Sequence, residues 1–453
     1  MRRLLIILFT LSFGAEACAI TLNEALEAAY ENNIQLKEKR EELKKRDEQV
    51  MQAVSRMLPT VRVSRSKING KSKPSLEREN DGAQTRTMDG ITSSLVLTQN
   101  LFHSGADFAT LMSAKNIVEA YRAELESQEQ EILRSVVQHF LRLKGAESKY
   151  QHAKKMSVDT KKYVEASKKR FEVGDITKTD VARAKSAHAN IVAKKAQYWS
   201  EYVSEKESFK NFTGLEPKGL VLPDAFKILK IPSSMDEALA VSIRKNPKVI
   251  FAEKVKKARQ SEVKASMGGV LPKVDLTHQV RDSTHAPVYS NDRNVRLSQT
   301  TTVDVTVPIF DGGASWSKIR EAKRENKKSE YSFVNANNEV TQMAVSGWTR
   351  VDSAKLVYTG SKESFEAAKI AFEGALEEEK AGIRSSYDVI QYQLEYLERY
   401  TNYIDARTSL YDSLYYLKAA MGECTAKGLG LKVKLYDPLK NYNSIKWQLI
   451  GAY

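Results

Sequence analysis

The stretch TLNEALEAAYENN from Thr21, with the LPTVRV that follows from Leu58, decides the fold because both segments return later in the chain. The second copies are SMDEALAVSIRKN from Ser234 and LPKVDL from Leu271, so the offset is 213 residues both from 21 to 234 and from 58 to 271. A chain that repeats its own pattern in order is built from two structural copies of one unit.

The repeat continues to the end of the second copy. LTQNLFHSGA at residues 97–106 is answered by VTVPIFDGGA at 305–314, and VGDITKTDV at 173–181 by AGIRSSYDV at 381–389, now with an offset of 208. Each copy has the order helix, β-hairpin, long helix, helix. The sequence therefore predicts a signal peptide over residues 1–19, repeat 1 over 20–213, a connector over 214–233, repeat 2 over 234–422 and a C-terminal tail over 423–453.

The composition favours long helices. Of 453 residues only 10 are Pro and 21 are Gly, while 28% are charged. The net charge of +14 comes from Lys and Arg that alternate with Glu along the chain rather than forming one patch. Because binding to phosphates requires a concentrated basic surface, we expect no nucleic acid as a partner.

The amino terminus, MRRLLIILFTLSFGAEACA, has two arginines, a short apolar run and an A-x-A ending, which is typical of a cleaved secretory signal. Lipidation of Cys18 is an alternative. With the signal removed, Cys424 is the one remaining thiol, so no intramolecular disulfide is expected. No later stretch approaches about 18 consecutive apolar residues, and a membrane crossing would therefore require a closed barrel.

Two segments read as unusually long helices. Residues 105–174 contain no proline and place apolar side chains every three or four positions, which predicts a rod of about 65 residues and roughly 100 Å. Residues 314–380 repeat it. Four shorter helices, of about 37 residues each, are expected over 21–57, 177–213, 235–270 and 385–421. On their own these helices would also fit a solvated coiled coil.

Four strands separate this chain from a simple coiled coil. TVRVSRSKING from Thr60 and GITSSLVLTQNLF from Gly90 flank a polar loop, and two segments near Val274 and Val303 repeat the arrangement. Apolar residues alternate with polar ones in the lipid-out, water-in pattern of an outer-membrane barrel. Four strands cannot enclose a wet interior, so copies of the chain would have to pool them. The alternative is a pair of surface hairpins.

These elements, in this order, resemble the TolC-type outer-membrane efflux proteins from Thr21 to about Gly422. The features that carry the resemblance are the doubled helical starts, the turns Gly174…Asp180-Val181 and Gly382…Asp388-Val389, and four strand-helix junctions. Those junctions are marked by Pro59, Phe102, Pro272 and Phe310.

The resemblance implies a mainly α homotrimer with an α-helical periplasmic tunnel, continued by a shared 12-stranded β-barrel with four strands from each protomer. It implies an equatorial position for the connector and the tail. It also implies a place in the outer membrane of a Gram-negative bacterium, in contact with its lipid. The implied function is an exit duct for a tripartite efflux pump or a type I secretion system. Its partners would be a periplasmic adaptor and an inner-membrane pump or ABC transporter.

The resemblance further implies a periplasmic gate at the hairpin tips. In the family, an arginine two residues after the second glycine bonds the first hairpin's aspartate. Here that arginine is Arg384, with Thr179 and Asp180 to receive it. Where the family has a second aspartate one turn after the first, this chain has Gln391 after Asp388, so a trimer would carry three carboxylates there and weak cation block is expected.

No pattern predicts catalysis. The six histidines are scattered, and neither a metal-binding spacing nor a glycine-rich phosphate loop occurs. We therefore expect no enzyme activity, cofactor or metal. The tyrosines from Tyr396 to Tyr416 have helical spacing and are interpreted as interhelical packing. The competing function is a non-conducting structural or adhesive coiled coil of the cell envelope.

Overall fold

A computed structural model describes residues 20–72, 86–217, 219–222, 231–287, 294–446 and 448–451. The predicted signal peptide, with Cys18, lies outside the described residues, as do residues 73–85 of the polar loop between the first two predicted strands. The described residues fold into two compact units. The first takes the chain up to Arg40, Glu124–Ile250 and Ala336–Tyr436, and the second takes Glu41–Ala123, Phe251–Asn335 and Asp437–Tyr453.

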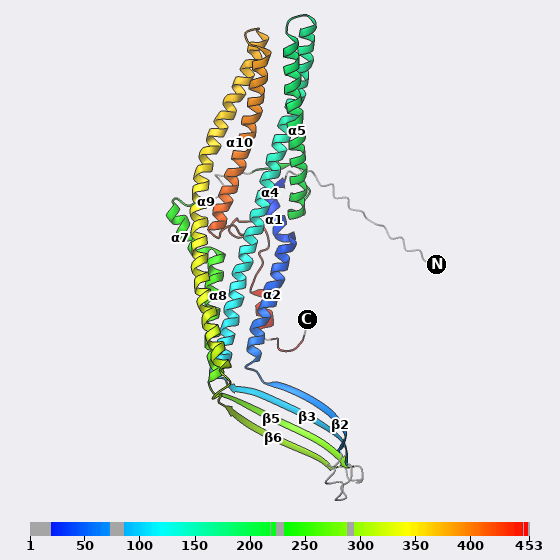
Figure 1. Ribbon diagram of the computed structural model, residues 1–453, viewed down its shortest axis with the longest axis vertical. Helices are drawn as coiled ribbons and strands as arrows, with labels where there is room; N and C mark the ends of the chain where they lie inside the picture. The colour runs from blue at the N-terminus through cyan, green and yellow to red at the C-terminus, as the bar shows by residue number, and fades with distance from the viewer. Residues whose placement is uncertain are drawn as a thin grey trace, which may run out of the picture. The chain divides into compact units, whose positions relative to one another are not determined.

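The two long helices are present and equal in length. α4 (Ala106–Glu172) and α9 (Ala314–Lys380) each have 67 residues, which corresponds to about 100 Å. α5 (Lys178–Thr213) returns beside α4, and α10 (Ser386–Ala420) returns beside α9 (Figure 1). Among the described helices, none has a stretch that is long and apolar enough to cross a bilayer.

The other two helices that the sequence predicted as continuous are each broken at an asparagine. Residues 21–57 form α1 (Leu22–Asn32) and α2 (Ile34–Ser55), and residues 235–270 form α7 (Met235–Lys245), α8 (Pro247–Met267) and a short 3₁₀ turn, Gly268–Val270. Asn33 and Asn246 are both extended, with ψ near 124° and 125°. Each caps the next helix with its side-chain oxygen, which accepts from the backbone N–H of Leu36 or Lys248. Pro247 adds a second reason in repeat 2, because the residue before a proline disfavours helical dihedrals.

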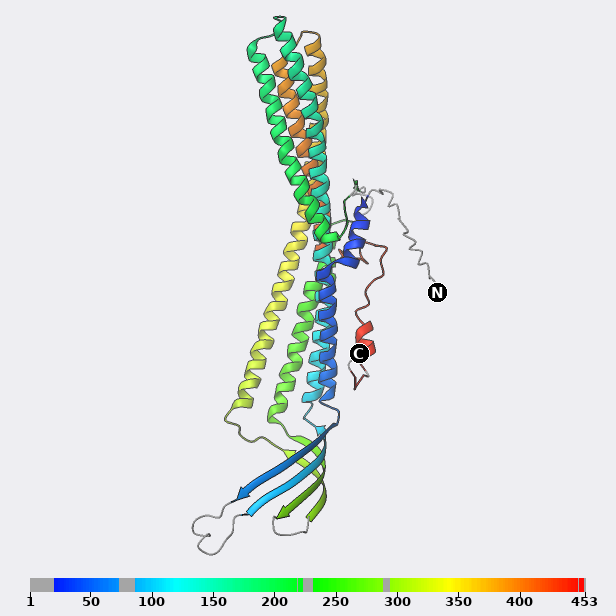
Figure 2. The same cartoon turned by 90° about the vertical axis from the view of Figure 1, so that its right-hand side faces the viewer.

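The four predicted strands form one antiparallel sheet in the second unit. Its order is β2 (Thr60–Ser72), β3 (Arg86–Phe102), β5 (Lys273–Pro287) and β6 (Asn294–Thr306), as Figures 1 and 2 show. β2 and β6 are therefore the edge strands. A small parallel pair, β1 (Ile20–Thr21) with β4 (Leu220–Val221), belongs to the first unit.

The register of the sheet gives it one apolar and one polar face, as the alternation predicted. Val63 lies opposite Leu95, which lies opposite Val280, and Leu276 pairs with Val303. One residue along, a row across all four strands is polar: Ser64, Ser94, Arg281 and Ser298. The apolar side chains are largely exposed in a single chain, with Val63 at 75% and Leu95 at 43%. Such a face is suited to lipid rather than to a protein core.

The strand-helix junctions hold the sheet to the helices of the same unit. Pro59 and Pro272 immediately precede β2 and β5, whereas Phe102 ends β3 and Phe310 follows β6, both largely exposed. His103 bridges two acids, with Nε2 2.9 Å from Asp275 and Nδ1 2.9 Å from Asp107. Sequence reasoning missed this contact because 172 residues separate His103 from Asp275.

Aromatic packing joins the long helices of the first unit, as the tyrosine spacing predicted. The ring of Phe365 on α9 lies 5.3–5.6 Å from those of Tyr396, Tyr400 and Tyr403 on α10. His152 of α4 stacks on Tyr400 at 3.9 Å, and its Nε2 is buried without a hydrogen-bond partner in the described chain. Burial, with a smaller contribution from the charge of Lys155, lowers the pKa of His152 to about 4.

This histidine predicts a specific pH dependence of stability. Between pH 6.5 and 4 the unfolded chain binds a proton at this site and the folded chain does not, so the free energy of unfolding should fall as pH falls, by about 2 to 3 kcal/mol. His152→Phe keeps the aromatic stack and should flatten this window in thermal melts. His188→Phe, on α5 of the same unit, is the matched control and should keep the wild-type slope.

Candidate functional site

The two helical hairpins of the first unit end in glycine turns at equivalent positions of the repeat. Gly174 follows α4 with φ of 78°, and Gly382 follows α9 with φ of 73°. Only glycine adopts this left-handed conformation readily, and it allows the next residue's N–H to reach back into the last helical turn. Asp175 N–H thus donates to Arg170 O, and Ile383 N–H donates to Glu378 O.

The two predicted gate aspartates lie in the first turns of the returning helices and bond to the N-cap residues Thr177 and Ser385. The carboxylate of Asp180 accepts from Thr177 N–H at 3.0 Å and from Thr177 Oγ1 at 2.7 Å, while Thr177 Oγ1 accepts from Asp180 N–H. These hydrogen bonds from Thr177 lower the pKa of Asp180. Asp388 takes a hydrogen bond from Ser385 Oγ at 2.9 Å. Thr179 and Gln391 are exposed beside them.

Arg384 binds within its own hairpin. Its Nε contacts Glu378, at the end of α9, and its Nη1 donates to Tyr392 Oη at 3.2 Å. Glu378 lies just across the turn from Arg384, so this pair closes with little ordering of the chain. Within the described chain, Arg384 is therefore joined to neither Thr179 nor Asp180.

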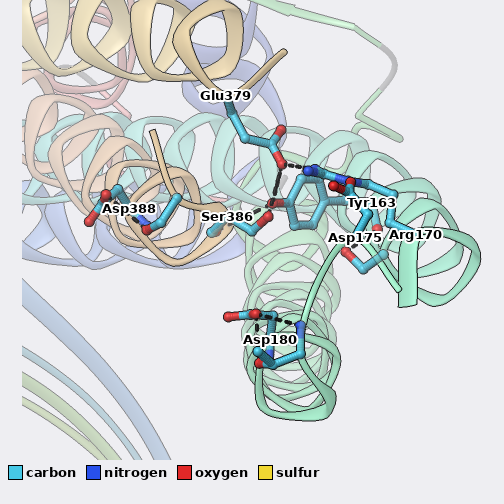
Figure 3. Close-up of polar contacts among 10 residues, drawn as sticks. Tyr163, Arg170, Asp175, Asp180, Glu379, Ser386 and Asp388 are labelled. Carbon is cyan, nitrogen blue, oxygen red and sulfur yellow. Dashed lines mark hydrogen bonds and ion pairs between the residues drawn. The ribbon is translucent and has the colours of Figure 1, made fainter. Parts of the chain in front are cut away.

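The contact that joins the two hairpins involves other residues. Glu379 Oε1 accepts from Arg170 Nη1 at 2.7 Å, from Ser386 Oγ at 2.9 Å and from Tyr163 Oη at 3.2 Å, and Figure 3 shows the carboxylate reaching Arg170 from the opposite hairpin. Arg170 is held in turn by Asp175 at 2.6 Å. We call Tyr163, Arg170, Glu379 and Ser386 the tip brace.

The tip brace is shielded enough for its polar contacts to matter. The Glu379 side chain is 10% exposed and Arg170 is 39% exposed. Burial, aided by the negative charge of Glu379, raises the pKa of Tyr163 to about 12, so its hydroxyl stays a donor at all physiological pH values. An apolar cluster of Val164, Ala184, Ala187 and Ile390 packs beside it.

The sequence contained only part of a signal for this brace. With the offset of 208, Arg170 matches Glu378, so the two repeats carry opposite charges at that tip position. The contact itself is made by Glu379, which matches the uncharged Phe171, while Glu378 pairs with Arg384.

The described part of the chain contains no group of three or more His, Cys, Asp or Glu side chains that could hold a metal ion.

A four-stranded sheet with one lipid-suited face, together with two 67-residue helices that each return in a hairpin with a polar turn, defines an outer-membrane channel of the TolC type. The chain belongs to the outer membrane efflux protein family, whose model matches residues 25–214 and 239–423. The two matched stretches correspond to the two copies recognised in the sequence, each ending one residue beyond its copy.

Individual relatives agree with this family. The outer membrane efflux protein BepC of Brucella suis is 26% identical over 443 residues, covering 98% of this chain and 94% of the relative. The proteases secretion protein PrtF of Dickeya chrysanthemi is 21% identical and covers 87% of each chain. The crystal structure of the Campylobacter jejuni CmeC outer membrane channel superposes with a TM-score of 0.77 at 17% identity, over 95% of this chain and 90% of that chain.

The tip brace predicts a measurable coupling between the hairpins. Arg170→Ala leaves a nearly buried carboxylate with weaker partners, so we expect a coupling free energy of about 2 kcal/mol between Arg170→Ala and Glu379→Gln. Hydrogen exchange of the tip amides in the double-mutant cycle measures it. The exposed pair Arg399 and Glu395 is the control, for which about 0.5 kcal/mol or less is expected. A coupling near zero for Arg170 and Glu379 would contradict the brace.

Proposed function

We propose that this outer-membrane protein is the passive exit duct of a tripartite efflux pump or a type I secretion system, without catalysis of its own. The observation that carries the proposal is the sheet, with one apolar face and two free edge strands, in a chain of the outer membrane efflux protein family. Relatives named for efflux and for protease secretion support both kinds of system.

The proposed assembly is a homotrimer. A four-stranded sheet leaves the edges β2 and β6 unpaired, and unpaired backbone groups are too costly in lipid to persist. Three copies give twelve strands, an even number within the range of outer-membrane barrels. The repeats over residues 20–213 and 234–422 would then supply equivalent parts of one tunnel, with the connector 214–233 and the tail 423–453 around it.

The proposed partners are a periplasmic adaptor and an inner-membrane pump or ABC transporter, which would dock at the hairpin tips. The tips are suited to this because their polar contacts can be exchanged for contacts with a partner at little cost. The tip brace would hold the two hairpins of one protomer together. Because Arg384 is already bound to Glu378 within its own chain, we place its contact with Asp180 and Thr179 between neighbouring protomers.

Electrical recording tests the function directly. The purified protein in planar lipid bilayers should conduct ions at low, stepwise single-channel levels, because the tip contacts restrict a continuous pore. The control is the same detergent preparation after heat denaturation, which should give no steps. A water-soluble oligomer that never conducts would contradict the duct and favour the envelope coiled coil.

The gate assignment makes a second prediction at the same bilayer. Arg384→Ala and Asp180→Ala should each raise single-channel conductance, and Glu379→Gln should raise it through loss of the brace. Lys380→Ala removes a tip cation whose one carboxylate partner within the described residues is the exposed Glu377, and it is expected to leave conductance unchanged. If Arg384→Ala and Asp180→Ala both conduct like the wild type, the latch between protomers is wrong, and Glu379→Gln then decides whether the brace acts alone.

A further inference from the structure

The first four turns of α9 carry a row of exposed cations. Arg320, Lys323, Arg324 and Lys327 are spaced i, i+3, i+4 and i+7, so they lie on one helix face, and all four are exposed. We call them the basic stripe. Two exposed aromatic residues flank it on the same face, Trp316 at 58% and Tyr331 at 66% exposure.

The basic stripe points away from the rest of its own unit. Ser329, on the opposite face of the helix from Arg320, is 6% exposed, and Ile319, which borders the stripe one turn before Lys323, is 4% exposed. Lys327 pairs with Glu330 at 2.9 Å, whereas Arg320, Lys323 and Arg324 have no carboxylate partner in the described chain. Like charges three or four residues apart on a helix repel each other, so this row is destabilising unless another surface neutralises it.

The topology of the sheet identifies what lies beyond that face. α9 follows the edge strand β6, and α2 precedes the other edge strand, β2. If edge β6 of one copy pairs with edge β2 of the next, the helices attached to those strands are brought side by side. The neighbour of α9 is then α2 of a second copy, running in the opposite direction.

α2 offers a complementary face. Its buried side is made by Leu43, Asp47 and Val50, at 1%, 0% and 2% exposure. The opposite side presents Glu41, Lys45, Glu48 and Gln52, and Glu38 continues the row by one turn. In the described chain Glu48 has no cation partner, and Glu41 pairs only with Lys44, on its own helix.

The heights of the charges above the sheet also agree. Glu48 lies seven residues before the end of α2 and Arg320 six residues after the start of α9, both about 10 Å along their helices. Glu41 and Lys327 are likewise both about 20 Å along. Lys45 and Arg324 are both about 15 Å along, so this level carries two like charges, and Arg324 is also within one turn of Glu48.

We propose that the basic stripe of α9 docks onto the Glu41–Gln52 face of α2 in a second copy of this chain, and that these charges set the register of assembly. The interface rests on the oligomer of the proposed function. It specifies which two helices meet, with the positively charged side on α9 and the glutamates on α2. The stripe is then buried between protomers rather than open to the lumen.

Disulfide cross-linking tests the geometry. Gln52→Cys and Trp316→Cys in one chain lie three and two residues from the sheet-side ends of α2 and α9, and oxidation should join separate chains into covalent dimers and trimers. Gln52→Cys with Ser332→Cys, about 24 Å farther along α9, is the control and should form no covalent link between chains. Cys424, the one cysteine in the described chain, is fully buried, and burial raises the pKa of its thiol to about 12, so it should not react.

Charge reversal tests the energetics. Arg320→Glu or Glu48→Arg alone should weaken association by about fivefold at each of the three interfaces, the upper range for one exposed ion pair, so the trimer fraction should fall, and the double reversal should restore it. Native gel electrophoresis and light scattering measure that fraction. Recovery in the double variant is the result that a merely misfolded helix would not give.

The outcomes separate this interface from the proposed function. Wild-type trimers that conduct but show neither the Gln52–Trp316 cross-link nor any response to the reversals overturn the interface alone. Reversals that change ion selectivity but not assembly place the basic stripe in the lumen, and they also overturn it. A wild-type protein that neither assembles nor conducts contradicts the proposed duct itself.

Discussion

The structure depends on one constraint, which is that a four-stranded sheet has two edges and a lipid bilayer tolerates none. Strands β2 and β6 each leave a row of backbone N–H and C=O groups without partners in the single chain. In water these groups would be hydrated, but in hydrocarbon each would cost several kcal/mol. The sheet, with its exposed Val63 and Leu95, is therefore half of an interface until another copy completes it.

The same constraint orders the helices. Each strand continues into a helix, so strands that pair also bring their helices side by side. Backbone hydrogen bonding at the sheet edge therefore determines which side chains meet about 10 to 20 Å along those helices. The His103 bridge between Asp107 and Asp275 strengthens this link, since it ties the start of α4 to β5. At the other end of α4 the polar contacts are different in kind. They join side chains across hairpins, and the backbone of each hairpin is already satisfied.

Much of the fold could be predicted from the sequence. Periodicity and doubling gave the two rods, the four strands and their apolar face, because these features depend on local spacing that a repeat makes unmistakable. The asparagine breaks were harder: Asn33 and Asn246 are visible as a matched pair, but a single polar residue in a helical pattern does not reveal an extended backbone. The capping bond from Leu36 to Asn33 is what settles it.

The candidate site was predicted less well, for a reason that lies in its chemistry. The resemblance to the family predicted a contact between Arg384 and Asp180. Inside one chain, however, Arg384 pairs with Glu378 and Asp180 is hydrogen-bonded to Thr177. Partners close in sequence are favoured because bringing them together costs less chain entropy. The brace through Arg170 and Glu379 joins residues 209 apart. Spacing rules do not find it, because Glu379 matches the uncharged Phe171 in the first copy of the repeat.

The asparagine breaks have a consequence for how the short helices meet the long ones. An uninterrupted helix fixes the angular position of every later side chain, so a drift in its apolar row accumulates along its length. At Asn33 the chain leaves the helix for one residue and α2 begins with a new phase. The buried row of α1, which includes Leu26 and Tyr30, therefore does not dictate where Leu36 and Leu43 point. Each break therefore lets the second helix begin with its apolar side at a new angle about the helix axis, and both copies of the repeat have such a break at the same place.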